Sequence, residues 1–226
     1  MSHEVKILET EMLNHNVKRF VTTKPASYEY VAGQATAVTL LRDGLESEPR
    51  PFTFTSLPED RHLEFMIKLY YDRDGVTDEL SSVGEGERFE IGEPDGAITY
   101  AGPGTFIAGG AGLTPFIPIL RDLRAKDELA GNQLWFFNSH PRDIFLESEL
   151  RETFGKGDDL RLLVTDHEGD TSYEEAELDE AFCQNNLETD DGRFYICGPP
   201  EMTESAIELL QDMGIDDERI IAENWS

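Results

Sequence analysis

Cysteine and histidine are scarce in this chain, whose 226 residues include only Cys183, Cys197 and five histidines. Two cysteines that lie far apart cannot by themselves hold an iron–sulfur cluster, form a zinc knuckle or build a disulfide framework. None of the histidines has a spacing that argues for a catalytic pair with a cysteine. We therefore expect no metal site, and we expect Cys197 to pack or to contact a ligand rather than to act as a nucleophile.

Long apolar runs are also missing. No stretch reaches the length of a membrane span, and the N-terminal sequence MSHEVKILET has no signal-peptide pattern. Both absences favour a cytoplasmic protein. Hydrophobic residues still make up 38% of the chain, including 13 Phe and 7 Tyr, so a packed core can form. The length allows one large domain or two of ordinary size.

Positively charged residues are also few. The chain has 19 Lys and Arg against 47 Asp and Glu, and its net charge is −28. Nucleic-acid binding is disfavoured, since neutralising phosphates requires a basic face. The acidic residues are scattered through the chain rather than gathered in a tail. Such scatter suggests a surface adapted to high salt, where repulsion is screened, although an ordinary acidic bacterial protein is the alternative.

Two common phosphate-binding fingerprints are absent, namely a Gly-Lys-Ser/Thr ending and G-x-G-x-x-G. Residues 106–123, FIAGGAGLTPFIPILRDL, instead predict a short buried strand, a glycine turn and a helix. Thr114 can cap that helix and Pro115 suits its first position. Outward amide groups, missing Cβ atoms and the helix dipole would favour a phosphate at this turn. Taken alone, the turn could equally be a tight strand-to-helix connection.

The first hundred residues are rich in β-branched and aromatic residues between Gly, Pro, Asp and Asn, and they predict a β-barrel or sandwich. One short helix should interrupt the strands, with Thr77 as its cap, Asp78 and Glu79 in its first turn and Gly84 at its end. The predicted strands are 5–13, 17–24, 35–40, 51–55, 62–71 and 87–92.

From about residue 103 the pattern changes to alternating strands and helices, which predicts a parallel sheet with ligands beyond the carboxyl ends of its strands. The change places a domain boundary near residues 100–104. The predicted strands are 106–108, 134–138, 160–164, 193–197 and 219–225, and the predicted helices run from the glycine turn to about 129 and over 146–154, 174–182 and 199–213.

Three further stretches could join the glycine turn in one site. RPFTFTS at 50–56 offers an arginine for phosphate and an aromatic face, although in isolation an aromatic strand edge is the better interpretation. Residues 67–84 run through a loop into a capped helix, which is either an anion site or a surface helix. YICGPPEM at 195–202 delivers Cys197 to the sheet edge, and Gly198 there permits close approach of a ligand.

The order of these stretches resembles the ferredoxin–NADP(+) reductase-like flavoproteins over essentially the whole chain. RPFTFTS resembles that family's R-x-Y-S/T-x-x-S flavin motif, and GGAGLTP resembles its G-G-x-G-x-T-P nucleotide motif. YICGPPEM resembles its C-G-P-P motif, and the terminal ENWS resembles its acid-x-aromatic ending. The resemblance implies an antiparallel Greek-key β-barrel that binds FAD, residues 1–101, followed by a parallel-sheet α/β domain that binds NAD(P)H, residues 102–226.

For the flavin, the resemblance implies that Arg50 contacts the phosphates, Phe52 stacks on the isoalloxazine ring and Thr53 lies near its reactive N5. The family usually has Tyr at position 52, so one hydroxyl hydrogen bond is lost here. Ser226 follows the terminal aromatic residue, which can alter how tightly the tail closes. The other implied contacts are the backbone of Met66, Ile67 and Lys68 at the pyrimidine edge, Gly75, Val76 and Thr77 at the pyrophosphate, and Trp225 over the flavin face.

For the nicotinamide nucleotide, the implied pyrophosphate contacts are Gly110, Gly112 and Thr114. Cys197, Gly198 and Pro199 would lie beside the nicotinamide ring, with Glu223 near the reaction centre. Thr53, Cys197 and Glu223 are therefore the implied catalytic residues.

The choice between NADPH and NADH is nearly even from the sequence. His140 and Arg142 could bind the 2′-phosphate of NADP, but Asp143 would repel it. The segment NSHPRDIF at 138–145 also resembles NADH-using relatives, so the prediction leans slightly to NADH.

The function implied is hydride transfer between NAD(P)H and bound FAD. Because the chain has no cysteine cluster, its electrons would pass to a separate carrier such as ferredoxin, flavodoxin or an oxygenase component, or to a small molecule. The alternative is a non-catalytic module that keeps the fold as a binding scaffold. Such a module would be expected to lose the flavin arginine, the glycine turn or the terminal aromatic residue, and all three are present.

Overall fold

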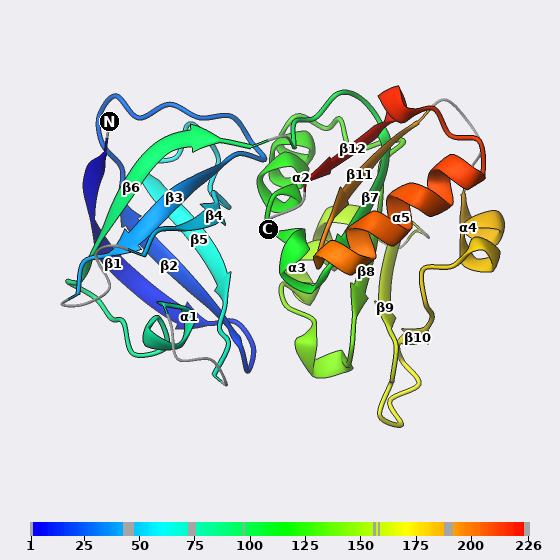
Figure 1. The fold of residues 1–226 in the computed structure, drawn as a ribbon, viewed down its shortest axis with the longest axis horizontal. Coiled ribbons are helices and arrows are strands. Elements are labelled where there is room, and N and C mark those ends of the chain that lie inside the picture. The colour runs from blue at the N-terminus through cyan, green and yellow to red at the C-terminus, as the bar shows by residue number, and fades with distance from the viewer. Residues whose placement is uncertain are drawn as a thin grey trace.

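The computed structural model describes residues 2–42, 48–71, 76–96, 98–155, 157, 159–187 and 192–223, with the backbone alone at 76 and 77. The chain forms two six-stranded sheets, one from each half, which lie side by side (Figure 1). The first sheet is antiparallel and the second is parallel. The predicted fold class is therefore confirmed.

The first sheet is a nearly closed barrel with the strand order β4-β3-β6-β1-β2-β5. A bridge between Phe54 and Phe65 connects the two edge strands and almost completes the closure. The strands are β1 (His3–Met12), β2 (Val17–Thr23), β3 (Ala35–Leu40), β4 (Arg50–Thr53), β5 (His62–Lys68) and β6 (Arg88–Asp95).

Aromatic side chains fill the barrel because alternate strand residues point inward. Phe20, Phe65 and Phe89 are completely buried. The Tyr30 ring stacks on the Phe54 ring with centroids 4.2 Å apart. Strand β5 and the residue that follows β4 are therefore anchored in this aromatic core.

The short helix α1 (Val76–Glu79) differs from the prediction at both ends. Thr77 lies inside the helix rather than at its cap, and Gly84 comes five residues after the helical part. The segment that follows is held by a lysine instead. The buried Lys18 Nζ donates to the carbonyls of Leu80, Ser81 and Val83 at 3.3, 2.9 and 2.7 Å. These charge-assisted bonds offset the cost of burying the ammonium group.

The second sheet is parallel throughout, with the order β10-β9-β8-β7-β11-β12. Helices α2 (Phe116–Ala125) and α3 (Glu147–Phe154) pack on one face, and α4 (Glu180–Asn186) and α5 (Pro200–Asp212) pack on the other. No helix in the described part of the chain is long and apolar enough to span a bilayer. The strands are β7 (Gly104–Gly109), β8 (Gln133–Asn138), β9 (Leu160–Val164), β10 (Glu174–Glu175), β11 (Arg193–Cys197) and β12 (Ile220–Glu223).

The helix predicted over residues 174–182 is wrong. Glu174 and Glu175 pair with β9 as strand β10, and α4 begins only after Asp179. The Asp179 carboxylate accepts a hydrogen bond from the Phe182 amide at 2.7 Å and caps the helix there. Sheet pairing and a local cap therefore override the helical propensity of the acidic run.

The start and end of α2 also depart from the prediction. A 3₁₀ turn, Gly110–Leu113, precedes the helix, and the Thr114 hydroxyl donates back to the Ala111 carbonyl at 2.9 Å. Thr114 therefore closes the turn instead of capping the helix, and Pro115 takes the cap position. The helix ends at Ala125, four residues before the predicted end.

The two halves share a hydrophobic core. The cluster beneath α2 and α3 contains Phe106, Phe116 and Leu134, but it also includes Val17 and Met66 from the barrel. Burying apolar surface across the boundary stabilises the contact between the halves. The interface between the two halves, which we call the seam, is therefore packed like the interior of a domain.

The segment between β6 and β7 is fixed by a tyrosine of the parallel sheet. The Tyr195 hydroxyl accepts a hydrogen bond from the Ala101 amide at 2.8 Å and donates one to the Gly102 carbonyl at 2.7 Å. The Tyr195 ring stacks on Phe106 with centroids 4.5 Å apart. The connecting segment therefore runs along a fixed path over the second sheet.

Candidate active site

A cavity of about 370 Å³ lies between the barrel and the carboxyl edge of the parallel sheet. Its barrel side comes from β4, β5 and the residues after β5, and its other side comes from the glycine turn and the loop after β11. The described residues that line it are Pro51, Phe52, Thr53, Met66, Ile67, Lys68, Tyr70, Gly109, Gly110, Ala111, Gly112, Thr114, Cys197, Gly198, Pro199 and Pro200.

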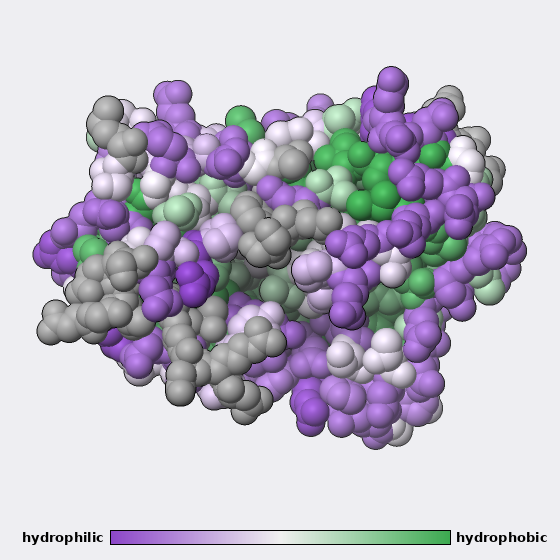
Figure 2. Space-filling view, in the orientation of Figure 1, coloured by the Kyte–Doolittle hydropathy of each residue, from purple (hydrophilic) through white to green (hydrophobic). Residues whose placement is uncertain are grey.

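The flavin-motif stretch, the glycine turn and the Cys197 loop thus meet in one space although they are far apart in the sequence. A larger and more open hollow lies along residues 211–218, but none of the predicted site residues lines it. Hydrophilic residues are widespread on the described surface in Figure 2, in keeping with the acidic composition, and an apolar patch lies at the upper right. The interdomain cavity is therefore the candidate active site.

The barrel wall is made of side chains. Phe52 is half-buried and packs against the barrel core, while Thr53 and Met66 are buried. Arg50 opens β4 but does not line the cavity, and its Nη2 lies 3.1 Å from Glu48 Oε2. A phosphate bound by Arg50, as predicted, would have to compete with this carboxylate.

The opposite wall is rich in glycine, and two of its glycines leave no room for a side chain. A Cβ added at Gly112 would lie 2.0 Å from the Cys197 carbonyl oxygen. One added at Gly109 would lie 2.3 Å from Met202 Sδ. Gly109 and Gly112 are therefore required by loop packing, and the predicted contacts of the glycine turn with a phosphate and of Gly198 with a ligand stay predictions. A Cβ added at Gly198 would likewise lie 3.2 Å from the Gly109 Cα, so backbone of the two loops lies close together there.

Gly110 differs from its neighbours, because its φ is +51° and the space beside it opens toward the barrel. A Cβ there would lie 3.7 Å from Lys68 Nζ. Lys68 carries the only formal charge among the described residues that line the cavity. One ammonium group beside exposed amides gives this part of an acidic protein a local attraction for anions.

Cys197 ends β11, where its backbone pairs with Glu223 of β12. Burial, with a further contribution from the negative charge of Glu223, raises the pKa of the Cys197 thiol to about 12. The thiol is therefore protonated at neutral pH, which fits the predicted packing or ligand-contacting role and not a nucleophile.

Glu223 is buried, but it is not among the residues that line the cavity. Its Oε1 lies toward Gly96, where an added Cβ would approach it to 3.2 Å. The carboxyl group thus reaches the barrel from the edge of the parallel sheet. Its predicted place near the reaction centre stays a prediction.

His140 and Arg142 follow β8 and do not line the cavity. Both face Glu168, whose Oε1 lies 3.9 Å from His140 Nδ1 and 3.7 Å from Arg142 Nη1. The Asp143 carboxylate instead accepts a hydrogen bond from the His140 amide at 3.0 Å. Sequence reasoning missed Glu168, and no local motif could have identified it, since it comes from the loop after the next strand.

Tyr70, Ala111 and the Lys68 side chain were also missed as cavity residues. The Lys68 ammonium lies 5.9 Å from the centre of the Tyr70 ring. Predicted site residues Gly75 and Trp225 lie outside the described part of the chain, as do the side chains of Val76 and Thr77. Their predicted contacts with FAD stay predictions.

Both sides of the cavity offer apolar surface. Phe52 and Met66 form an apolar surface on one side, and Pro199 with the neutral Cys197 forms one on the other. The described lining includes no acidic side chain. The space beside the Gly110 backbone, which we call the cradle, is open. A barrel and a parallel sheet that share such a cleft have the architecture of a two-domain nucleotide-binding protein, with the ligand at the carboxyl ends of the parallel strands.

Comparison with known families identifies both halves. Residues 2–103 match the FAD-binding domain, and residues 106–208 match the oxidoreductase NAD-binding domain. The chain belongs to the ferredoxin–NADP(+) reductase-like flavoproteins, with FAD and a nicotinamide dinucleotide as its cofactors. The resemblance inferred from the motifs is thereby confirmed.

Among curated proteins, the chain is 26% identical to the reductase component of propane 2-monooxygenase from Rhodococcus jostii, over 92% of this chain and 59% of that protein. The chain thus spans about three-fifths of that relative's length. It is also 27% identical to NADH-cytochrome b5 reductase 2 from Danio rerio, over 98% of this chain and 84% of that protein.

Solved structures share the fold. A ferredoxin NADP+ reductase from Neisseria gonorrhoeae with bound FAD and NADP has a TM-score of 0.84 at 21% identity, covering 99% of this chain and 98% of that one. The CS-b5R domains of human Ncb5or in the NAD+ form have a TM-score of 0.86 at 24% identity, covering 99% and 70%.

Proposed function

We propose that this protein is an NAD(P)H-dependent reductase that moves a hydride between the nicotinamide and bound FAD and exchanges electrons with a separate redox protein. The observation that carries the proposal is the shared cavity. It brings the flavin-motif residues Phe52 and Thr53 opposite the glycine turn and the Cys197 loop. Neither half alone encloses this space.

Positioning is the main contribution asked of the protein in such a reaction. The flavin would supply the capacity to take two electrons together and release them one at a time. Hydride transfer requires the nicotinamide and flavin rings face to face, with reacting atoms about 3–3.5 Å apart. Phe52 and Met66 would support one ring and Pro199 the other, while the protonated Cys197 would contact the nicotinamide without adding charge.

Lys68 would attract the nucleotide to this cleft. Its ammonium group lies beside the open cradle at Gly110, where a pyrophosphate could accept hydrogen bonds from backbone amides and from Nζ. Because the chain carries a net charge of −28, a dianionic ligand gains from one local cation near its phosphates.

NADH is the nucleotide that the surroundings of β8 favour. Glu168 lies beside both cations that could otherwise bind a 2′-phosphate, and its charge would oppose that phosphate. We expect faster flavin reduction by NADH than by NADPH. Glu168→Gln should narrow the difference, and Arg142→Ala should further weaken NADPH while changing NADH little. A wild type that prefers NADPH would contradict this preference.

The electron partner is a separate protein in this proposal. Relatives include a monooxygenase reductase component and a cytochrome b5 reductase, and ferredoxin or flavodoxin would suit the same role. An acidic partner would be repelled by this surface at low salt. Activity with an acidic acceptor should therefore rise with salt before it falls, and a steady decline from low salt would argue against such a partner.

The decisive experiment is purification followed by anaerobic titration. The proposal expects a yellow protein with a flavin spectrum that NADH or NADPH bleaches. A colourless protein that ignores added FAD would support a non-catalytic binding module instead. A protein that binds FAD but is not reduced by either nucleotide would exclude the reductase activity while leaving the flavin assignment intact.

A further inference from the structure

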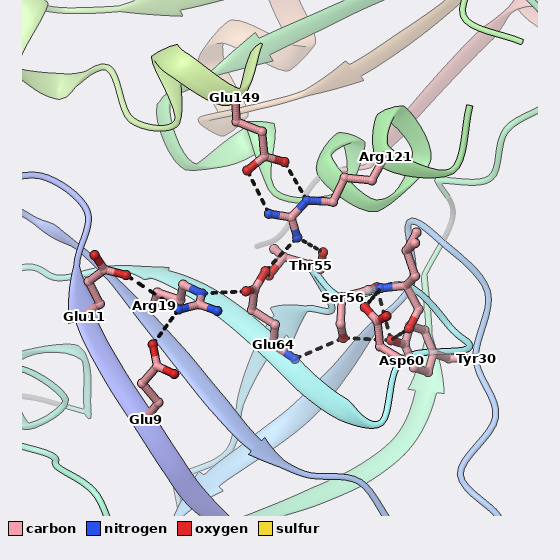
Figure 3. Close-up of polar contacts among 11 residues, drawn as sticks. Glu9, Glu11, Arg19, Tyr30, Thr55, Ser56, Asp60, Glu64, Arg121 and Glu149 are labelled. Atoms are coloured by element: carbon pink, nitrogen blue, oxygen red, sulfur yellow. Dashed lines mark hydrogen bonds and ion pairs between the residues drawn. The ribbon is translucent and has the colours of Figure 1, made fainter. Parts of the chain in front are cut away.

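One arginine of the parallel-sheet domain reaches across the seam and ends on the barrel (Figure 3). Arg121 on α2 uses Nε and Nη2 to bind both oxygens of Glu149 on α3, at 2.6 and 3.0 Å. Its Nη1 donates to Glu64 Oε1 at 2.8 Å and to the Thr55 carbonyl at 2.7 Å. We call Glu64, Arg121 and Glu149 the interdomain clasp.

The Glu64 carboxylate of the clasp is also held by barrel residues. The Thr55 hydroxyl donates to Glu64 Oε1 at 2.9 Å, and Arg19 Nε lies 2.5 Å from Glu64 Oε2. Arg19 also pairs with Glu9 at 2.9 Å, so it remains tied to the barrel (Figure 3). Glu64 is 8% exposed and therefore has little freedom to move away.

Charge is retained at this buried position. Burial disfavours the ionised form of Glu64, but the guanidiniums of Arg121 and Arg19 outweigh it and hold the pKa of that carboxyl below its ordinary value of 4.5. The pKa of Arg121 is raised, since its two carboxylate partners outweigh burial. At neutral pH the clasp places one guanidinium between two carboxylates at hydrogen-bonding distance.

The clasp is attached directly to both walls of the cavity. Glu64 lies two residues before Met66 on β5, and Thr55 lies two residues after Thr53. Arg121 lies on the helix that continues from the glycine turn, seven residues after Thr114. One guanidinium therefore connects the strands of the side-chain wall to the helix that carries the backbone wall.

We propose that Arg121 and Glu64 are positioning residues for hydride transfer, because they set the spacing and tilt of the two walls and hence of the two rings. The inference rests on the proposed reductase function and adds residues that touch neither ring. A displacement of about 1 Å at reacting atoms can cost roughly a hundredfold in rate. A loosened clasp should therefore slow the hydride step far more than it weakens nucleotide binding.

The test compares five single variants as FAD-loaded holoproteins. Glu64→Gln keeps the shape and removes the charge, Arg121→Lys keeps the charge without the planar fork, and Arg121→Met removes both. Arg19→Met is the matched control, because it removes a partner of Glu64 without breaking a bond between the domains. Arg124→Met controls for charge loss on α2, where Arg124 makes an exposed contact with Glu152 at 3.9 Å.

Rapid anaerobic mixing with NADH should separate the rate of flavin reduction at saturation from the nucleotide dissociation constant. We expect the saturating rate to fall roughly 10- to 100-fold in Arg121→Met and Glu64→Gln. The dissociation constant should stay within about threefold, and the long-wavelength charge-transfer absorbance of the stacked rings should weaken. Arg121→Lys should recover part of the rate, and both controls should remain within about twofold of wild type.

The double variant Glu64→Gln/Arg121→Met should be no slower than the worse single variant, since both changes break one link. Clasp variants that keep their FAD and the wild-type saturating rate would overturn the positioning role, even if their melting temperature falls. Equal slowing in Arg19→Met would overturn it as well. A wild type that NADH and NADPH both fail to reduce would instead overturn the proposed function and this inference together.

Discussion

The two walls of the cavity differ in the groups that they present. The barrel wall presents side chains such as Phe52, Met66 and Lys68, whereas the opposite wall presents the backbone of the glycine turn and of the loop after Cys197. Side chains can be exchanged one at a time without moving their strand. Backbone packed against backbone leaves no such freedom, because any added atom meets a neighbouring loop.

The two walls should therefore tolerate substitution differently. Side chains on the barrel side can change in ways that alter ligand affinity or reaction rate, whereas loop packing restricts which residues fit on the nucleotide side. Substitutions on the two walls should therefore fail in different ways. The backbone wall should lose stability and binding together, and the side-chain wall should lose one property at a time.

Gly112→Ala should give the largest effect. Its Cβ would lie 2.0 Å from the Cys197 carbonyl oxygen, so the glycine turn and the Cys197 loop must separate. We expect a loss of about 3 kcal/mol in the free energy of unfolding, measured by urea denaturation of the holoprotein, together with loss of nucleotide binding.

Gly84→Ala is the matched control, because an added Cβ there meets nothing within 4 Å. It should change the free energy of unfolding by less than about 1 kcal/mol. If Gly112→Ala were as stable as this control, the backbone wall would have more room than the structure gives it.

Lys68→Met should come next, and it should alter binding without altering stability. Losing one charge-assisted hydrogen bond to a phosphate corresponds to roughly a tenfold or greater rise in the NADH dissociation constant. The saturating reduction rate should change less than about threefold. Stopped-flow titration at several salt concentrations checks this, and the salt dependence of NADH binding should become shallower.

Lys68→Arg should restore most of the affinity, because it keeps the cation. Lys6→Met removes the same charge from the exposed surface of β1, away from the cavity, and serves as the control. An equal loss of affinity in Lys6→Met would attribute the effect to net charge and remove Lys68 from the site.

Phe52→Tyr should give a smaller effect of the opposite sign. If the Phe52 ring lies against the flavin as proposed, an added hydroxyl supplies a hydrogen bond worth about 1 kcal/mol, a fewfold gain in FAD affinity. Phe52→Ala should lower FAD affinity by removing the aromatic face. Flavin fluorescence during dilution measures both, and unchanged affinity in both variants would separate Phe52 from the flavin.

Cys197 should give the smallest effect on the reaction. Because its pKa is raised to about 12, the rate of flavin reduction between pH 6 and 9 should not follow thiol ionisation, and Cys197→Ala should keep the wild-type pH profile. Alkylation of the native protein at pH 8 should be roughly a thousandfold slower than in urea, in line with the smaller thiolate fraction. Fast native labelling at Cys197 would contradict a buried neutral thiol.

The raised pKa of Cys197 also predicts how the stability of the protein depends on pH. Since the folded pKa lies above the unfolded value of about 9, this thiol contributes stability that is complete below pH 9 and is lost as pH rises toward 12. Part of the alkaline loss of stability should therefore disappear in Cys197→Ala. Cys183, whose pKa is raised to about 11 by burial, should add a similar contribution.

Local sequence patterns predicted much of the fold. β-branched and aromatic residues marked all six barrel strands, several of them with alternation, and strand–helix alternation marked the parallel sheet. These periods follow from backbone geometry. The prediction failed where a distant partner decided the outcome. Residues 174 and 175 pair with β9 rather than join a helix, and Thr114 bonds back into the turn.

By itself, the sequence determined the order of two domains, the glycine turn and the motif stretches that meet in the cavity. The tertiary structure alone decided which atoms face one another there. It placed Lys68 beside Gly110, Gly112 against Cys197, and Arg121 on Glu64, which is 57 residues away in the chain. Such pairs depend on how whole elements pack, and a pattern confined to neighbouring residues contains no record of that packing.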